Sequence, residues 1–294
     1  MASPADTLFA LDAEFSLTLD AFTADFARTL EPTLRALRLR VNALIRQMER
    51  EDGRVVQTQV NLGLAQRALA TLEATLVQAG YEQSVTAAYA RLPRLVRFTG
   101  LSEAARAFSA FDLATVEAFR VVKARELTDL FTTGADKASQ VLLKGVMGAQ
   151  DEGELLAELE DLLNETAAHA RTLYETGLSE FVQTMTALHS DGTPDEAFLF
   201  SGPIDARIRP FCLAHVGRVY TRKAIDAMNN GMLNNTFISR GGYNCRHMWH
   251  RVANIDALKA TADTGAFSSE RARFQVEGAE AAAKAIPRRE RKAA

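Results

Sequence analysis

The 294-residue sequence has few of the features that mark secreted or membrane-spanning proteins. It contains only two cysteines, which is too few for a disulfide framework and favours a reducing compartment. No apolar run approaches the ~20 residues that a membrane helix needs, so we expect no membrane segment. The first 27 residues carry only acidic charges. A secretory signal peptide begins with basic residues, so we expect none here.

Several common catalytic motifs are also missing from the sequence. It has no P-loop, no GxGxxG after a predicted strand and no HExxH. We therefore expect a protein that is not an enzyme of those classes.

The net charge of −3 conceals two regions of opposite charge. Residues 1–200 carry 18 Lys/Arg against 29 Asp/Glu, a charge of −11, whereas residues 201–294 carry 16 against 8, a charge of +8. The basic region ends in four candidate nucleic-acid-binding residues: Arg288, Arg289, Arg291 and Lys292. These residues could bind packaged DNA or an acidic protein surface, or they could form a solvated chain end.

Apolar periodicity predicts helices over most of residues 1–190. A first helix should begin near Ala5 and be kinked or split at Pro32. Two stripes at helical spacing predict an antiparallel hairpin around Gly53: Leu34, Leu37, Val41, Leu44 and Met48, then Leu62, Ala65, Leu69, Leu72 and Leu76. After an irregular stretch at 92–100, helices are predicted at 102–132, 135–147 and 151–188.

A cluster of helix-breaking residues at 190–195 predicts a domain boundary. Beyond it we expect strands at 197–201, 218–221, 236–239 and 248–252. Thr221 should cap a short helix at 222–230, and further helices are expected at 254–261 and 269–285. The predicted fold is thus mainly α, with a helical arm or bundle over 1–190, a small α+β domain over 195–265, and a C-terminal helix and basic tail over 266–294.

The two cysteines and three of the five histidines fall within 39 positions of the α+β domain. Four of these residues have ligand spacing, in Cys212-x-x-His215 and Cys245-x-His247, and could hold one tetrahedral zinc ion. Strand-like alternation would place Cys245 and His247 on one face and His250 on the other, so His247 is the preferred fourth ligand. Alternatively, both cysteines are small buried side chains and no metal binds.

The same region contains a two-part motif. Its halves read Asp205-Ala206-Arg207-Ile208-Arg209-Pro210-Phe211-Cys212 and Gly241-Gly242-Tyr243-Asn244-Cys245-Arg246-His247. Over about residues 195–253 this pattern resembles the Mu-type phage head morphogenesis, or minor head, protein family. The matching residues are Asp205, Arg207, Pro210, Cys212, Asn244, Cys245 and Arg246. The sequence departs from the family at Arg209, where the family has its first cysteine, and at His247, where it often has its last.

The resemblance implies a structural and assembly component of a tailed-phage or phage-derived particle. Such a protein would contact the portal, the major capsid protein or packaged DNA in several copies, and would be assembled in the bacterial cytoplasm. The resemblance also implies that the two halves of the motif converge, with Asp205 paired to Arg246 or Arg207. The alternative is a nucleic-acid-binding or RNA-cleaving module in which His215 or His247 transfers protons.

Overall fold

The computed structural model describes residues 4–99, 110–190, 192–193 and 195–252. The predicted mainly α fold is confirmed, with long helices followed by short strands and helices. The chain forms two compact units. The helical unit comprises Asp20–Pro93 and Ala110–Gly177, and the mixed unit comprises Met1–Leu19, Arg94–Ser109 and Leu178–Ala294. The mixed unit therefore includes the start of the first helix and the end of a later one, which a boundary near residue 190 does not capture.

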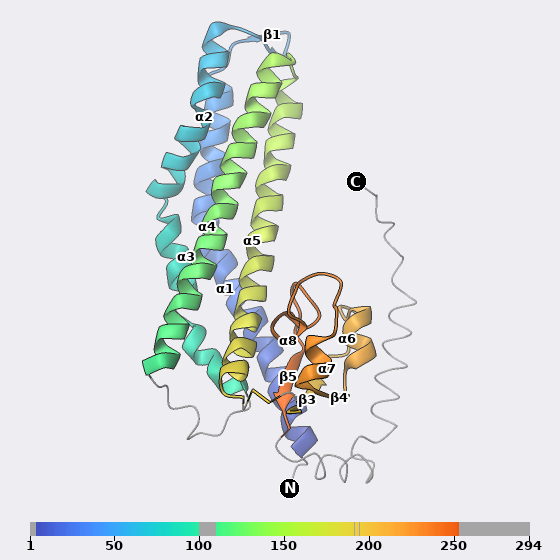
Figure 1. Cartoon of the computed structure of the whole chain (residues 1–294). Coiled ribbons are helices and arrows are strands. Elements are labelled where there is room, and N and C mark those ends of the chain that lie inside the picture. Colours follow the sequence, from blue (N-terminus) through green and yellow to red (C-terminus); the bar gives the residue numbers. More distant parts are fainter. Residues whose placement is uncertain (1–3, 100–109, 191, 194, 253–294) are drawn as a thin grey trace. The chain divides into compact units, whose positions relative to one another are not determined.

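Long helices build the helical unit (Figure 1). The elements up to residue 188 are α1 (Pro4–Arg46), α2 (Gln59–Gln78), α3 (Tyr81–Tyr89), the 3₁₀ helix η1 (Leu92–Thr99), α4 (Ala110–Met147) and α5 (Glu152–Leu188). Both α2 and α3 lie against α4. Helices α1 and α5 contribute residues to both units, and η1 belongs to the mixed unit apart from its first two residues.

Two helices joined by a tight turn are present as predicted, although α2 lies chiefly against α4. The stripe from Leu34 to Met48 is buried at all five positions, whereas Leu62 and Leu69 on α2 are only partly buried. The link contains two short antiparallel strands, β1 (Arg50–Glu51) and β2 (Arg54–Val55). Asp52 and Gly53 join them with φ angles of 49° and 79°. Positive φ at both central residues is the geometry that an Asp-Gly hairpin turn provides.

The long helices are more continuous than the sequence predicts. Pro32 does not split α1, which runs unbroken from Pro4 to Arg46. The predicted break between 132 and 135 is also missing, since α4 continues through Gly134. A Cβ on Gly134 would lie 3.0 Å from the Thr166 side chain. This glycine therefore serves the close packing of α4 on α5 rather than ending a helix.

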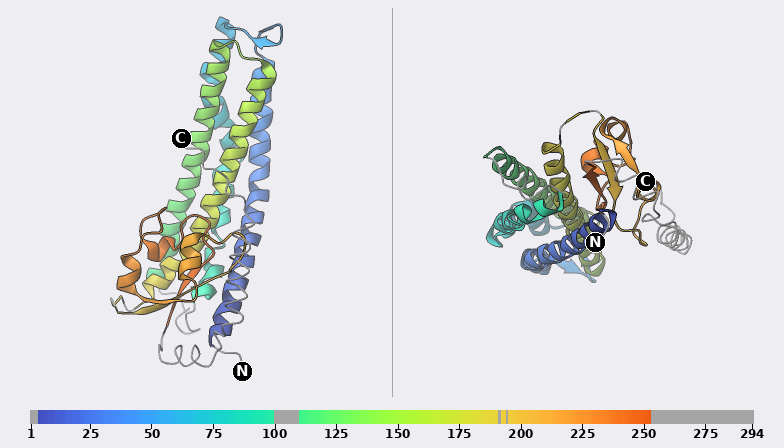
Figure 2. Two further views of the ribbon diagram at one scale, coloured as in Figure 1. Left: turned by 90° about the vertical axis from the view of Figure 1, so that its right-hand side faces the viewer. Right: turned by 90° about the horizontal axis from the view of Figure 1, so that it is seen from below.

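The mixed unit contains a small antiparallel sheet with the strand order β4-β3-β5 (Figure 2). Its strands are β3 (Ala197–Ser201), β4 (Val219–Thr221) and β5 (Met248–Arg251), close to three of the four predicted. The fourth prediction is wrong, because Thr236–Ser239 forms helix α8. Asn235 explains this difference, since its side chain accepts a hydrogen bond from the Ile238 amide and caps the helix.

Two further short helices, α6 (Pro210–His215) and α7 (Arg222–Asp226), complete the mixed unit. The Thr221 side chain caps α7 as predicted, although α7 ends earlier than expected. The core of this unit is built from Phe198, Phe200, Cys212, Ile225, Phe237, Cys245 and Trp249. Gln183 of α5 fixes Trp249 by accepting from its backbone amide and donating to its carbonyl oxygen. Both motif cysteines therefore lie in the core of the unit.

No helix among the described residues is both long and apolar enough to cross a membrane. The helices predicted at 254–261 and 269–285, and the basic residues Arg288, Arg289, Arg291 and Lys292, lie outside the described residues.

Candidate metal centre

The first half of the motif forms a turn followed by a short helix. The Asp205 side chain accepts a hydrogen bond from the Arg207 amide at 2.9 Å, which closes a local turn. Pro210 then starts α6, a position where a proline ring is favoured because the missing amide hydrogen has no partner to lose. One turn later Cys212 is buried, with 2% of its surface exposed. The motif residues thus set the path of the chain that brings Cys212 into the core.

The second half of the motif is a tight, irregular turn before β5. Arg240, Gly242 and Asn244 all have positive φ angles, of 51°, 90° and 52°. Asparagine and glycine adopt this conformation more easily than other residues, which explains why Gly242 and Asn244 suit their positions. Cys245 and His247 follow in an extended segment that precedes β5. They lie together as predicted, but they are not part of a strand.

An ion pair joins the two halves. Arg246 donates to both carboxylate oxygens of Asp205, at 2.7 and 2.8 Å. The Arg246 side chain is 6% exposed and that of Asp205 is 40% exposed. The hydrogen bonds from Arg246 lower the pKa of Asp205 below its usual value, against the smaller effect of burial. The structure thus selects Arg246, of the two predicted alternatives, as the side chain that pairs with Asp205.

Cys212, Cys245 and His247 are brought into one buried cluster. The two sulfurs are 3.7 Å apart, and the Cys245 sulfur lies 4.0 Å from His247 Nδ1. The possible ligand atoms of all three residues lie within 4.8 Å of one another. These three of the four predicted ligands therefore form a set that could hold a metal ion.

His215 does not join this cluster. Its Nδ1 is hydrogen-bonded to the Tyr220 hydroxyl at 2.7 Å, and its ring packs against Phe211. Burial and the nearby charge of Arg218 lower the pKa of His215. The Cys-x-x-His spacing is misleading because it spans a helical turn that directs Cys212 into the core and leaves His215 at the end of α6, beside β4.

Two glycines make room for the cluster. A Cβ on Gly241 would lie 2.2 Å from the Cys212 sulfur and 3.1 Å from the Cys245 sulfur. A Cβ on Gly202 would lie 2.7 Å from the His247 ring. Because real Cβ atoms do not approach so closely, both positions require glycine. The backbone itself therefore forms part of the wall around the three side chains.

The spacing of the cluster fits a tetrahedral zinc ion. Two sulfurs bound at ~2.3 Å with tetrahedral angles lie about 3.8 Å apart, and a bound sulfur and imidazole nitrogen lie about 3.6 Å apart. The observed 3.7 and 4.0 Å are close to these values. The Gly241 amide also donates to the Cys245 sulfur at 3.3 Å, as backbone amides around metal-bound thiolates commonly do. The donor set and these two distances therefore fit zinc, and the third pair of ligand atoms lies within 4.8 Å.

Charge around the cluster favours a thiolate at Cys245. Burial opposes ionisation, but hydrogen bonds from Cys212 and His247 and the charge of Arg240 outweigh it and hold the pKa of Cys245 well below its usual value. The hydrogen bond to Cys245 and burial raise the pKa of Cys212. Since metals bind thiolates rather than thiols, Cys245 is the better prepared ligand.

Arg240 is a buried cation that no sequence motif indicates. It is fully buried and donates to the Ser179 carbonyl oxygen at 2.7 Å and to the Ser179 hydroxyl at 2.9 Å. Among the described residues, no carboxylate forms an ion pair with it. Burial lowers the pKa of Arg240, and the nearby Cys245 and Glu180 oppose this effect.

The nitrogens of His247 and His250 differ in their availability. His247 stacks on Phe200 at 5.3 Å, and its Nε2 has no hydrogen-bond partner within the described part of the chain. His250 instead bonds through Nε2 to Asp12 at 2.7 Å, and both residues of this pair are buried. His250 is therefore tied to α1, whereas His247 keeps Nδ1 beside the Cys245 sulfur and Nε2, partnerless among the described residues, on the other side of the ring.

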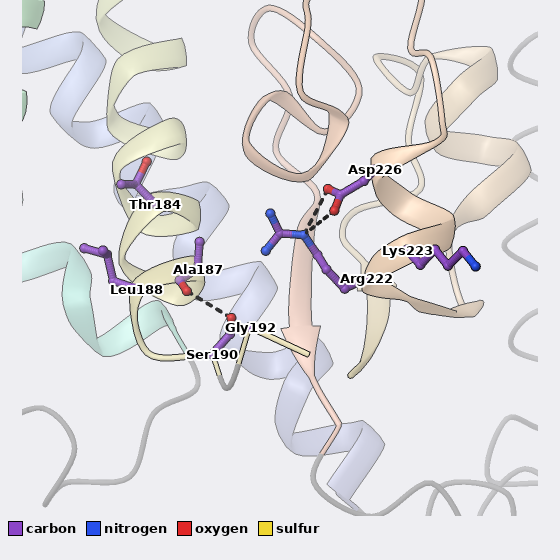
Figure 3. A pocket seen from close by; sticks show the side chains of 8 residues that line it. All are labelled: Thr184, Ala187, Leu188, Ser190, Gly192, Arg222, Lys223 and Asp226. Atoms are coloured by element: carbon purple, nitrogen blue, oxygen red, sulfur yellow. Dashed lines mark hydrogen bonds and ion pairs between the residues drawn. The ribbon is translucent and has the colours of Figure 1, made fainter. Parts of the chain in front are cut away.

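A surface groove lies elsewhere in the mixed unit, between the end of α5 and α7 (Figure 3). It encloses about 720 Å³ and is lined by Arg222, Lys223 and Asp226 on one side. The Arg222 guanidinium stacks on Phe237 and binds Asp226 through Nε. Nucleophile and base do not converge in this groove, so it offers no catalytic arrangement.

Comparison of the chain with protein-family models, with curated proteins and with solved structures found no match.

Proposed function

We propose that this protein is a structural and assembly component of a tailed-phage or phage-derived particle. The observation that carries the proposal is the meeting of the two motif halves, through the Asp205–Arg246 pair and the contact of Cys212 with Cys245. Segments 33 residues apart meet at the residues that carry the family resemblance. If the motif resembled the family only by chance, there would be no reason to expect its two halves to contact each other.

The roles of the motif residues support a scaffolding function. Asp205 closes a turn and binds Arg246, Pro210 starts a helix, and Asn244 occupies a left-handed turn position. Each of these residues shapes the backbone or pairs with another part of the unit. We propose that the mixed unit docks on the portal or major capsid protein, in several copies within the virion, after assembly in the bacterial cytoplasm.

The RNA-cleaving alternative has less support. A general acid or base must reach the substrate, yet His247 is 3% exposed. His215 is more accessible, but its Nδ1 is already hydrogen-bonded to the Tyr220 hydroxyl at 2.7 Å. Binding of packaged DNA by the basic C-terminal residues remains a prediction from the sequence.

We further propose that Cys212, Cys245 and His247 hold one structural zinc ion. This proposal differs from the sequence prediction in omitting His215, whose nitrogen is bound elsewhere. Zinc would join α6 to the segment before β5 and would add its binding energy to the folding of the mixed unit. The fourth ligand would come from outside these three side chains.

The particle proposal can be tested in the strain that encodes the protein. Particles are purified from this strain and from a deletion strain complemented with wild type, with Arg246→Ala, or with Arg218→Ala as an exposed control. We expect a constant ratio of the chain to the major capsid protein for wild type and Arg218→Ala, and a strong reduction for Arg246→Ala. Fully infectious particles that lack the chain would refute the proposal.

The zinc proposal can be tested by elemental analysis of the full-length chain purified without chelators. We expect one zinc ion per chain in wild type and in His215→Gln, and loss of zinc in His247→Gln and Cys245→Ser. The two histidine variants are matched, so they separate a specific ligand from general damage. Zinc-free wild type, or equal zinc loss in both histidine variants, would rule out the three-ligand site.

A further inference from the structure

The two cysteine sulfurs are placed for reaction with each other as well as for binding a metal. They are 3.7 Å apart, whereas a disulfide needs about 2.05 Å. Closing this gap requires a small movement of the sulfur atoms. Cys212 lies on the six-residue helix α6, and Cys245 lies in a segment that is neither helix nor strand, so neither is locked in a long regular element.

The surroundings leave the path between the sulfurs open. Gly241 lies directly over both sulfur atoms and has no side chain to separate them. At the same time Cys212 and Cys245 are only 2% and 3% exposed. This burial excludes a bulky thiol such as glutathione from the folded unit and favours a small neutral oxidant as the reactant. Once one sulfur is oxidised, the other is the nearest thiol that can resolve it.

We propose that Cys212 and Cys245 are a redox site, at which a peroxide closes an intramolecular disulfide that excludes the metal. Hydrogen peroxide oxidises one sulfur to a sulfenic acid as its O–O bond breaks and one water leaves. The second sulfur then attacks, forming the S–S bond, and the sulfenic oxygen leaves as a second water. The two sulfurs together lose two electrons, and the peroxide gains them.

The metal-bound and disulfide forms are alternatives because they use the same sulfur electrons. A disulfide sulfur carries no negative charge and is a poor zinc ligand. Oxidation would therefore replace a zinc crosslink between α6 and the segment before β5 by a covalent one. The release of metal rests on the proposed zinc site, whereas formation of the disulfide rests on the sulfur geometry alone.

The test treats the full-length protein with increasing hydrogen peroxide and follows it by peptide mapping and intact mass. We expect a Cys212–Cys245 linkage within one chain, a mass lower by two hydrogens, and one zinc ion released to a chromogenic chelator per disulfide formed. Dithiothreitol added to the unfolded chain, followed by refolding with zinc, should restore both thiols and zinc binding. Cys212→Ser should instead accumulate a sulfenic acid at Cys245 that dimedone traps when the chain is unfolded in its presence.

Three outcomes would overturn the inference. These are oxygen adducts on the cysteines without a linkage, disulfides only between chains, and thiols that survive peroxide concentrations at which free glutathione is fully oxidised. The wild-type measurement decides the matter even when the variant does not fold. A chain purified without zinc would defeat the zinc proposal and the release step, while the mapped disulfide would still be measured on the same sample.

Discussion

The two units of this protein differ in what they bury. In the helical unit the buried side chains are apolar apart from three tyrosines, a few threonines and one asparagine, among the described residues. In the mixed unit the buried set also includes two cysteines and five Asp, Arg and His side chains: Asp12, Arg240, Arg246, His247 and His250. The helical unit is therefore held mainly by apolar packing, which tolerates small shifts, whereas the mixed unit depends on polar contacts that must form together.

The largest expected effect is on apolar packing in the helical unit. Leu44 is 5% exposed, and Leu39 on the same helix is 62% exposed. Leu44→Asp should lower the free energy of unfolding by more than ~4 kcal/mol, because it buries a carboxylate without a partner. Leu39→Asp should change it by less than ~0.5 kcal/mol. Urea unfolding followed by far-ultraviolet circular dichroism measures both. Similar losses in the two variants would mean that the stripe is not the packing surface.

A somewhat smaller effect is expected from Arg240 in the mixed unit. Arg240→Met should cost about 3 kcal/mol, since it removes both hydrogen bonds from the guanidinium to Ser179 and the positive charge near the buried Cys245 sulfur. Trp249 is the only tryptophan and lies in the core of this unit, so its fluorescence reports the unfolding. Exposed Arg218→Met is the control and should behave as wild type. A neutral Arg240→Met would show that polar contacts do not hold this unit together.

Asp205→Asn should have a moderate effect that depends on pH. Because Arg246 lowers the pKa of Asp205 in the folded chain, the stabilisation is complete above about pH 4 and is lost as the pH falls through the folded pKa. We expect a loss of about 1 kcal/mol at pH 7, limited by the exposure of Asp205. The difference from wild type should shrink below pH ~4. An undiminished difference in acid would point to packing rather than charge.

The smallest expected effects come from two helix caps, one in each unit. Thr58 accepts from the Asn61 amide at 3.3 Å and Thr221 from the Ala224 amide at 3.2 Å. Thr58→Ala and Thr221→Ala should each cost about 1 kcal/mol or less. Calorimetry on both variants would compare them directly. If both variants lose the same free energy of unfolding, the two units differ only in their buried side chains. A much larger loss for Thr221→Ala would mean that they also differ in how strongly they depend on local structure.

Periodicity explains how much of the fold could be predicted. The stripe from Leu34 to Met48 is regular and fully buried, so the sequence alone indicates both the helix and its inner face. Pro32 was misleading because a single proline costs ~3 kcal/mol, which the packing of a long helix can offset. The sequence of α8 is compatible with a strand, and its cap, Asn235, lies in a segment rich in Asn and Gly that resembles a loop.

The candidate site was predicted only in part for a similar reason. Ligand type and spacing identify Cys212, Cys245 and His247, which the structure brings together. Spacing cannot show that Tyr220 occupies the His215 nitrogen, since that contact depends on the strand that follows α6. Nor does any local pattern connect Arg240 with Ser179, or His250 with Asp12, which lie 61 and 238 positions away. Pairings over such distances arise only once the unit has folded.

The hairpin at Asp52 and Gly53 offers a place for a label. Both residues are exposed, and the turn is the point where the chain reverses between α1 and α2. Exposed turn tips are sites where chains accept inserted residues, provided that no buried backbone is disturbed. The Gly53 carbonyl accepts from the Glu152 amide, so an insertion directly after Asp52 leaves that contact in place. A short epitope inserted at this point would allow antibody labelling of the protein in particles without replacing any of its residues.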